Sequence, residues 1–106
     1  MWFVEHLARD IVKVNDKWFI VDTCKTYDAG WETGIASVDL ERMRADWDDT
    51  FAEFGEELDE EWGDEYIREH AELYTEWWDV QNYRTRRQAE AGHKRVCRNG
   101  RLDEDE

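Results

Sequence analysis

The strongest constraint on this chain is a block, residues 39–79, that carries its whole excess of negative charge. The block holds 17 Asp and Glu against three Arg and no Lys, whereas acidic and basic residues balance at 11 each elsewhere. Apolar side chains recur through it every three or four residues, the period of an α-helix, and His70 fills the one gap. These apolar residues are Leu40, Met43, Trp47, Phe51, Phe54, Leu58, Trp62, Tyr66, Leu73 and Trp77. The block therefore predicts helices with an apolar stripe on one side and carboxylates on the other.

This helical block is too long to form one straight helix in a compact domain. A single helix over residues 40–77 would be about 57 Å long, whereas a compact chain of 106 residues has a radius of gyration of about 13 Å. We therefore expect a break. Gly63-Asp64 is the first candidate, with Gly63 ending one helix and Asp64 capping the next, and Gly55 is the second. Asp39, just before the block, is suited to cap the first helix.

Short β-prone runs precede the acidic block. Residues 11–14 and 18–21 predict two strands, and Asn15-Asp16 between them suits a tight hairpin turn. Residues 2–7 suit either an extension of the first strand or a short helix. Residues 31–38 predict a third strand. The N-terminal part of the chain is therefore expected to form a small antiparallel sheet.

The C-terminal part of the chain combines a strand with a basic helix. Residues 77–83 suit a fourth strand. Thr85-Arg86-Arg87-Gln88 is a capping box, and it opens a helix that should end at Asn99-Gly100. Residues 80–102 hold seven basic residues and one acid. Residues 103–106 are expected to form a frayed acidic tail.

Together these segments predict an α+β fold in a single domain, residues 1–102. A small antiparallel sheet, made of the N-terminal hairpin and one or two further strands, would carry an acidic helical hairpin and a basic C-terminal helix. The acidic helices would be an insertion at about residues 39–77. Seven Trp, four Tyr and four Phe supply enough apolar area to argue against disorder. The expected core includes five residues of the acidic stripe: Trp47, Phe51, Phe54, Leu58 and Trp62.

The sequence carries no recognisable export or membrane signal. It has no apolar run of 18 residues, so no transmembrane helix is expected. Its first residues lack the basic and apolar regions of a signal peptide. We therefore expect a cytoplasmic protein, in which Cys24 and Cys97, which form no CxxC pair, stay reduced.

No motif in the sequence specifies a reaction or a cofactor. The HExxH and CxxC spacings of metal sites are missing, and so are the Gly-rich loops that cradle phosphate. Carboxylate pairs are too numerous in this chain to point to glycoside hydrolysis. His70 is expected in the apolar stripe, and His6 and His93 are expected on the surface. We therefore expect no enzyme activity, no metal site and no cofactor.

The acidic block does present a candidate partner-binding surface. A net charge of −14 over its 41 residues corresponds to one charge per about 4.4 Å of helix, comparable with one per about 3.4 Å in a nucleic-acid strand. The alternatives left open are a solvated face, and an acidic block that pairs with the basic C-terminal helix within one chain or across a dimer. The candidate residues lie mostly three or four positions apart, and we call them the acidic row: Asp46, Asp49, Glu53, Glu56, Glu57, Glu60, Glu61 and Asp64.

Two short motifs outside the block resemble those of a known group of proteins. Tyr27-Asp28-x-Gly30-x-Glu32-Thr33 follows a predicted strand, and Tyr83-x-Thr85 is followed by Ala89 and Gly92-His93. Over residues 11–38 and 77–97 the chain resembles small uncharacterised proteins of phages and mobile elements in Gram-positive bacteria. Residues 39–76 would then be an acidic insertion. The resemblance implies a phage or mobile-element origin, and it implies no catalytic residues.

These features together predict an inhibitor of a host defence protein that handles nucleic acid, of the anti-CRISPR or anti-restriction type. By acidic nucleic-acid mimicry it would occlude the basic channel of a bacterial partner such as a CRISPR effector or a restriction enzyme. Direct binding to nucleic acid is not expected, because the net charge opposes it, and neither is membrane binding. The alternative is a non-catalytic structural or adaptor module, with a homodimer left open. The position of the basic helix discriminates between them, because a helix that covers the acidic row weakens mimicry.

Overall fold

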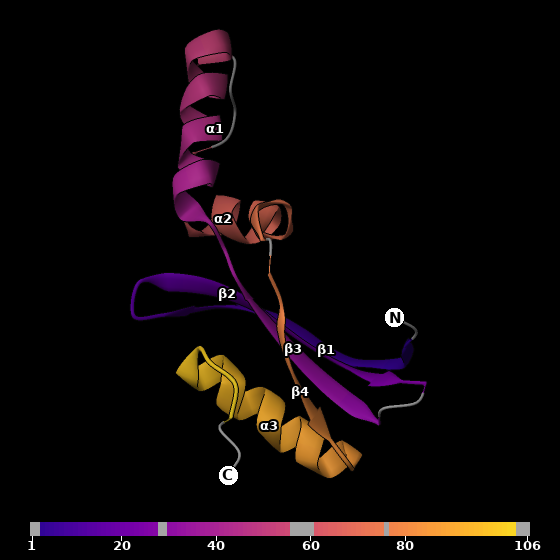
Figure 1. The fold of residues 1–106 in the computed structure, drawn as a ribbon. Coiled ribbons are helices and arrows are strands. Elements are labelled where there is room, and N and C mark those ends of the chain that lie inside the picture. The colour runs from indigo at the N-terminus through magenta and orange to yellow at the C-terminus, as the bar shows by residue number, and fades with distance from the viewer. Residues whose placement is uncertain (1–2, 28–29, 56–60, 76, 104–106) are drawn as a thin grey trace.

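A computed structural model describes residues 3–27, 30–55, 61–75 and 77–103 (Figure 1). It confirms the predicted α+β fold, with an antiparallel sheet and helices on both of its faces. The elements, in chain order, are β1 (Phe3–Val14), β2 (Lys17–Thr26), β3 (Trp31–Ser37), α1 (Leu40–Phe54), α2 (Asp64–His70), the 3₁₀-helix η2 (Ala71–Tyr74), β4 (Asp79–Tyr83) and α3 (Arg86–Asn99).

The strands follow one another across the sheet in the order β1-β2-β3-β4. The β1–β2 hairpin turns at Asn15 and Asp16, whose φ angles of 52° and 67° suit the two-residue turns that match strand twist. Residues 3–7 extend β1, so the alternative of a short helix there is wrong. The predicted fourth strand is confirmed at Asp79–Tyr83. All four strands thus form where local sequence predicts them.

α3 covers one face of the sheet (Figure 1). Its predicted capping box is present: the Thr85 hydroxyl accepts from the Gln88 N–H, and the Gln88 side chain accepts from the Thr85 N–H. Val96 is fully buried on this face and packs with Val21 of β2 and Ile35 of β3. The basic helix therefore packs its apolar side on the sheet and not on the acidic block.

The opposite face of the sheet carries a second core, which covers only part of it. Trp18 and Ile20 of β2 pack there with Met43 of α1 and Ile67 of α2. Because successive side chains of a strand point to opposite faces, Ile20 faces this core while Val21 faces α3. The sheet is thus the middle layer between the acidic helices and the basic helix.

The first helix of the acidic block ends at Gly55, the second candidate, and a new helix begins directly after Gly63. α1 begins after Asp39, whose carboxylate accepts from the Arg42 N–H, and it ends one residue before Gly55. Gly55 has a φ of 54°, a conformation that glycine adopts without steric cost. α2 then begins at Asp64, after Gly63 in extended backbone. The second candidate therefore ends α1, and Asp64 is the first helical residue rather than the cap.

The predicted core along the acidic stripe is correct only near the sheet. Trp47 is 8% exposed and Trp62 is half-buried, but Phe51 and Phe54 are 55% and 51% exposed. The prediction for these two Phe residues is wrong because the last turns of α1 extend past the sheet (Figure 1). The molecule accordingly measures 51 × 28 × 19 Å, with a radius of gyration of 16.2 Å, larger than the value of about 13 Å for a compact chain. Leu58 lies outside the described residues.

Asp103 does not belong to a frayed tail, and that prediction is wrong. Its carboxylate accepts from the Arg95 guanidinium at 2.8 Å and from the Tyr83 hydroxyl at 2.8 Å. The Arg95 hydrogen bond lowers the pKa of Asp103, and this effect exceeds the opposing effect of burial; the Tyr83 hydrogen bond lowers it further. The described chain therefore ends against α3 and β4, and residues 104–106 lie outside it.

Candidate functional site

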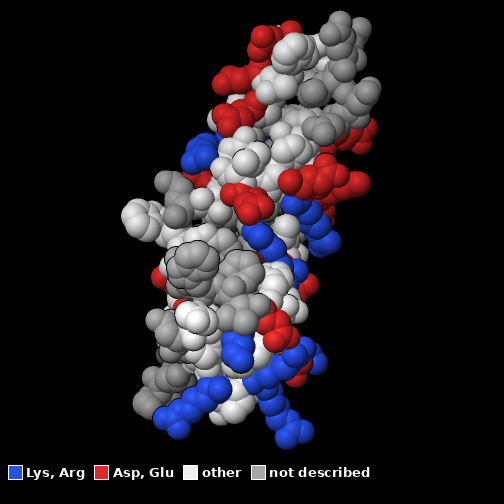
Figure 2. Space-filling model, turned by 90° about the vertical axis from the view of Figure 1, so that its right-hand side faces the viewer, with Lys and Arg blue, Asp and Glu red and all other residues white. Residues whose placement is uncertain are grey.

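The acidic helices stand at one end of the molecule, and we call α1 together with residues 61–70 the acidic projection. In Figure 1, α1 rises from the sheet on the side opposite α3. Figure 2 shows Asp and Glu gathered toward one end of the molecule and Lys and Arg toward the other. Basic side chains of α3 pair with Glu5, Glu90 and Asp103. The basic helix therefore lies apart from the described carboxylates of the acidic row and does not mask them.

The structure describes five of the eight carboxylates predicted to bind a partner. Asp46 accepts a hydrogen bond from the Tyr74 hydroxyl at 2.7 Å and is therefore engaged within the chain. The four that are exposed to solvent without such a contact are Asp49, Glu53, Glu61 and Asp64. The three that lie outside the described residues are Glu56, Glu57 and Glu60.

The contact between Asp46 and Tyr74 fixes the base of α1 to η2. The hydrogen bond to Asp46, followed by burial, raises the pKa of Tyr74 to about 12. The Arg42 guanidinium lies 5.1 Å from the centre of the Tyr74 ring and donates to the Leu73 carbonyl at 3.0 Å. Arg42 and Asp46, one turn apart on α1, thus both bind η2.

An aromatic cluster holds α1 against α2. The ring centroids of Trp47 and Tyr66 are 4.8 Å apart in an edge-on arrangement, and those of Trp62 and Tyr66 are 5.6 Å apart. The Arg44 guanidinium lies 5.0 Å from the centre of the Trp62 ring, and His70, half-buried as its place in the stripe predicts, stacks on Tyr66 at 4.0 Å. Aromatic pairs add about 0.5–1.5 kcal/mol each beyond the burial of their area. The cluster therefore sets the direction in which α1 leaves the sheet.

A hollow lies beside this cluster, at the start of α2. Residues 61–66 and Glu69 line it. Four of these residues carry carboxylates, and two, Trp62 and Tyr66, carry aromatic rings. A cation can pair with the carboxylates and also lie against an aromatic face. The hollow is therefore suited to an Arg or Lys side chain.

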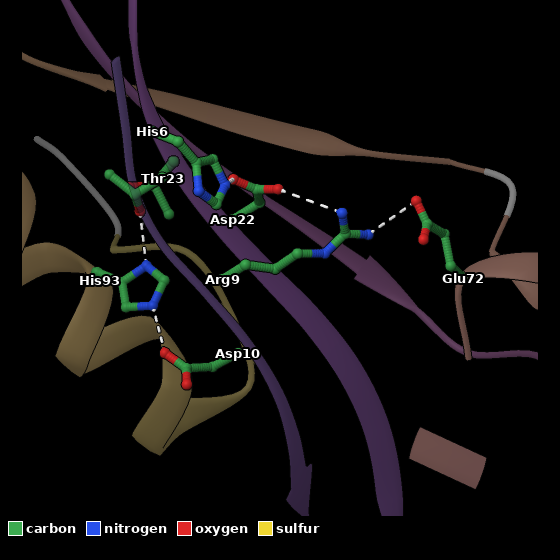
Figure 3. Close-up of polar contacts among 8 residues, drawn as sticks. His6, Arg9, Asp10, Asp22, Thr23, Glu72 and His93 are labelled. Atoms are coloured by element: carbon green, nitrogen blue, oxygen red, sulfur yellow. Dashed lines mark hydrogen bonds and ion pairs between the residues drawn. The ribbon is translucent and has the colours of Figure 1, made fainter. Parts of the chain in front are cut away.

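A cluster of polar side chains lies on the sheet face that also carries α2. His6 and Arg9 of β1 both approach Asp22 of β2, at 2.7 and 3.8 Å (Figure 3). Arg9 also contacts Glu72 at 3.1 Å. Cys24 lines the same groove, and burial, followed by nearby carboxylate charge, raises the pKa of its thiol. Because the thiolate is the nucleophilic form, this environment does not activate Cys24.

A chain of hydrogen bonds crosses the buried interface between α3 and the sheet. The hydroxyls of Thr33 and Thr23 are 2.6 Å apart, and the Thr23 hydroxyl lies 2.6 Å from His93 Nδ1. The Nε2 atom of His93 donates to Asp10 at 2.7 Å (Figure 3). His93 is 5% exposed, so the prediction of a surface position is wrong. Hydrogen bonds on both ring nitrogens explain how a polar ring is accommodated there.

Cys97 lies beside this chain, one helical turn after His93. Its Sγ is 3.9 Å from Oδ2 of Asp10. Burial, followed by the charge of Asp10, raises the pKa of the Cys97 thiol to about 11. The spacing of four residues between His93 and Cys97 puts both side chains on one side of the helix, and sequence reasoning missed that signal. Cys24 and Cys97 are free thiols on opposite faces of the sheet.

Comparison of the chain with protein-family models, with curated proteins and with solved structures found no match. The resemblance to small phage and mobile-element proteins therefore stays a prediction. Within the described part of the chain, no helix combines the length and the apolar character that crossing a membrane requires. Function must therefore be inferred from the surfaces themselves.

Proposed function

We propose that this protein is a non-catalytic inhibitor that binds a basic, nucleic-acid-handling host protein through the acidic projection. The observation that carries the proposal is the position of α3, which packs on the sheet face opposite α1 and leaves the five described carboxylates of the acidic row exposed. Had α3 covered that row, its Arg and Lys side chains would neutralise the charge within the chain. Like charges one turn apart on a helix cost a few tenths of a kcal/mol per pair, and a basic partner would offset that cost.

The projection has the dimensions and chemistry to enter a groove that holds nucleic acid. α1 has 15 residues and is therefore about 22 Å long. Its carboxylates would occupy positions of phosphates, and an Arg or Lys of the partner would enter the hollow at the start of α2. Phe51 and Phe54, exposed near the end of α1, would add apolar contacts. Inhibition would follow because the groove can no longer admit its nucleic acid.

In its concrete form the target is a bacterial defence protein, either a CRISPR effector or a restriction enzyme. The protein would then act in the cytoplasm of the bacterial host as the product of a phage or mobile element. The motif resemblance at residues 27–33 and 83–93 supports this origin. Occlusion needs no catalytic residue and no cofactor, in keeping with a Cys24 thiol that its surroundings do not activate.

The test compares two quadruple variants that lose equal charge. The projection variant carries Asp49→Asn, Glu53→Gln, Glu61→Gln and Asp64→Asn. The control variant carries Asp16→Asn, Glu32→Gln, Asp79→Asn and Glu90→Gln. Both are assayed with the wild-type chain for inhibition of DNA cleavage by a panel of CRISPR effectors and restriction enzymes, at low and at high salt.

For an enzyme that the wild-type chain inhibits, the projection variant should bind about tenfold more weakly or worse, mainly through a slower association rate. The control variant should bind within about threefold of wild type. Added salt should weaken wild-type binding, because the Debye length is about 8 Å at physiological salt and shortens above it. Neutralising like charges relieves repulsion, so the projection variant should melt no lower than wild type. Inhibition that persists in this variant or in high salt would refute the electrostatic mechanism.

An adaptor or homodimeric role is the second candidate, and exposed apolar side chains near β4 favour it. β4 lies at an edge of the sheet, and Trp77, Trp78 and Val80 are 85%, 40% and 46% exposed. An uncovered edge strand can pair with a strand of another chain. Sedimentation of the wild-type chain and of Val80→Lys tests this role. A dimer that Val80→Lys disrupts, together with no inhibition across the enzyme panel, would place the adaptor role first.

A further inference from the structure

The polar cluster between α3 and β1 has the composition of a metal site. Asp10, His93 and Cys97 offer one oxygen, one nitrogen and one sulfur, and these three atoms all lie within 4.8 Å of one another. His93 and Cys97 project from one side of α3, and the Asp10 carboxylate of β1 contacts both side chains; Figure 3 shows its contact with His93. We propose that these three side chains bind a divalent transition-metal ion, with Zn²⁺ as the ion that suits them best. This inference is independent of the partner-binding role of the acidic projection.

The present distances require only small movements to admit an ion. Tetrahedral Zn²⁺, with bonds of about 2.0–2.1 Å to N and O and about 2.3 Å to S, places its ligand atoms about 3.3–3.6 Å apart. Oδ2 of Asp10 now lies 2.7 Å from His93 Nε2 and 3.9 Å from Cys97 Sγ. Rotation of the Asp10 side chain, which is 55% exposed, can open the first separation and close the second. The same exposure gives the ion a route from solvent and leaves the fourth position to water.

The hydrogen-bond chain behind His93 orients its ring for this role. Ligating histidines usually place their second ring nitrogen on a hydrogen-bond partner, which fixes the ring and the tautomer. Here Nδ1 lies 2.6 Å from the Thr23 hydroxyl, which lies 2.6 Å from the Thr33 hydroxyl. In the metal-bound form Nδ1–H would donate to Thr23, and Thr23 would donate to Thr33. Every polar atom of this buried chain is then satisfied, and the lone pair of Nε2 points at the site.

Binding would exchange a proton for the ion. The Cys97 thiol would release its proton to solvent, the single ring proton of a neutral His93 would lie on Nδ1 rather than on Nε2, and the ion would replace the hydrogen bonds of both side chains to Asp10. A thiolate, an imidazole and a carboxylate suit Zn²⁺ and Co²⁺, whereas Ca²⁺ and Mg²⁺ prefer oxygen ligands alone. The bound ion would link α3 directly to β1. It would therefore stabilise the interface through which the basic helix covers the sheet.

The experiment uses Co²⁺ as a probe that reports on its own ligands. The full chain, expressed without a polyhistidine tag and stripped with chelator, is titrated with Co²⁺ in moderate salt, and thiolate ligation is read from the sulfur-to-cobalt absorption. We expect one Co²⁺ per chain and displacement by Zn²⁺. Cys97→Ser should abolish the sulfur-to-cobalt band, whereas the matched control Cys24→Ser should keep it. Surface carboxylates that bind Co²⁺ weakly give no such band.

Two further variants keep the outcome independent of any folding defect. Asp10→Asn changes a largely exposed side chain and should weaken binding at least about tenfold, as changes around metal sites do. His6→Gln, in the other polar group, should leave affinity unchanged. Zn²⁺ should also raise the melting temperature of wild type and of Cys24→Ser, but not of Cys97→Ser. A wild-type chain without the band, a band retained in Cys97→Ser, or a band lost in Cys24→Ser would each overturn the proposal.

Discussion

The two sides of the sheet bury their helices to different extents. α3 lies along the sheet, where Ala89 and Val96 are fully buried and even the polar ring of His93 is enclosed. Among the described residues, α1 packs only through its first half, where Met43 is buried, and Phe51 and Phe54 near its end remain exposed. Both helices have an apolar side with the same period. Periodicity therefore identifies which side of a helix is apolar, but not how much of that side is buried against another surface.

The largest predicted effect on stability is a difference between a substitution in the first half of α1 and one near its end. Trp47→Ala removes a buried ring that contacts Trp62 and Tyr66, and it should lower the free energy of unfolding by about 3–5 kcal/mol. Phe54→Ala removes a side chain that is 51% exposed and should cost about 0.5 kcal/mol or less. Urea unfolding followed by circular dichroism measures both values. Equal losses would mean that the end of α1 is covered in solution, and the comparison of the two halves would fail.

A smaller effect should appear on the α3 side, where close packing requires a glycine. A Cβ at Gly92 would overlap the Tyr83 side chain, and such overpacking costs about 1–3 kcal/mol. The gain in helix propensity offsets about 0.8–1.0 kcal/mol of this. Gly92→Ala should therefore lower the free energy of unfolding by about 1 kcal/mol in total.

The matched control for that change is Gly63→Ala in the acidic projection. A Cβ at Gly63 would meet no described atom within 4 Å, so thermal melting should change little. If Gly63→Ala proved as destabilising as Gly92→Ala, close packing would not be confined to the α3 side.

The smallest effect should depend on pH and concerns the chain end that packs on α3. The Arg95 hydrogen bond lowers the pKa of Asp103 below its ordinary value of 3.8. The pair of Asp103 and Arg95 therefore contributes fully to stability above pH 3.8, and this contribution is lost as the pH falls through the lowered pKa of Asp103. Asp103→Asn should cost about 1 kcal/mol or less at neutral pH, since Arg95 is partly exposed and solvent screens the pair. Melting curves between pH 2 and 7, in about 0.1 M salt, should show the two proteins converge in acid. A constant difference would rule out the ionic contribution.

Sequence reasoning succeeded for most local signals, although Asp64 does not cap α2 as predicted, and it failed where burial or pairing depended on a distant partner. The hairpin at Asn15-Asp16, the cap at Asp39 and the capping box at Thr85 each involve residues within about four positions, and all are present. Asp103 was misassigned because its partners, Arg95 and Tyr83, become neighbours only after α3 has packed. Among the candidate carboxylates, the engagement of Asp46 by Tyr74 was equally hidden from the sequence.

His93 shows the same limit most clearly, because its burial depends on Thr23 and Asp10, which lie 70 and 83 residues away. The class of fold, the four strands, the start of α1, the start of α3 and the segregation of charge could be predicted from the sequence alone, since these follow from turn chemistry, capping and periodicity along the chain. The packing of α3 on the sheet face opposite α1, and the exposure of Phe51 and Phe54, became visible only in the folded chain. Burial depends on which surfaces meet in space. This sheet covers the apolar side of α3 along its length, whereas it covers α1 only near the start of that helix.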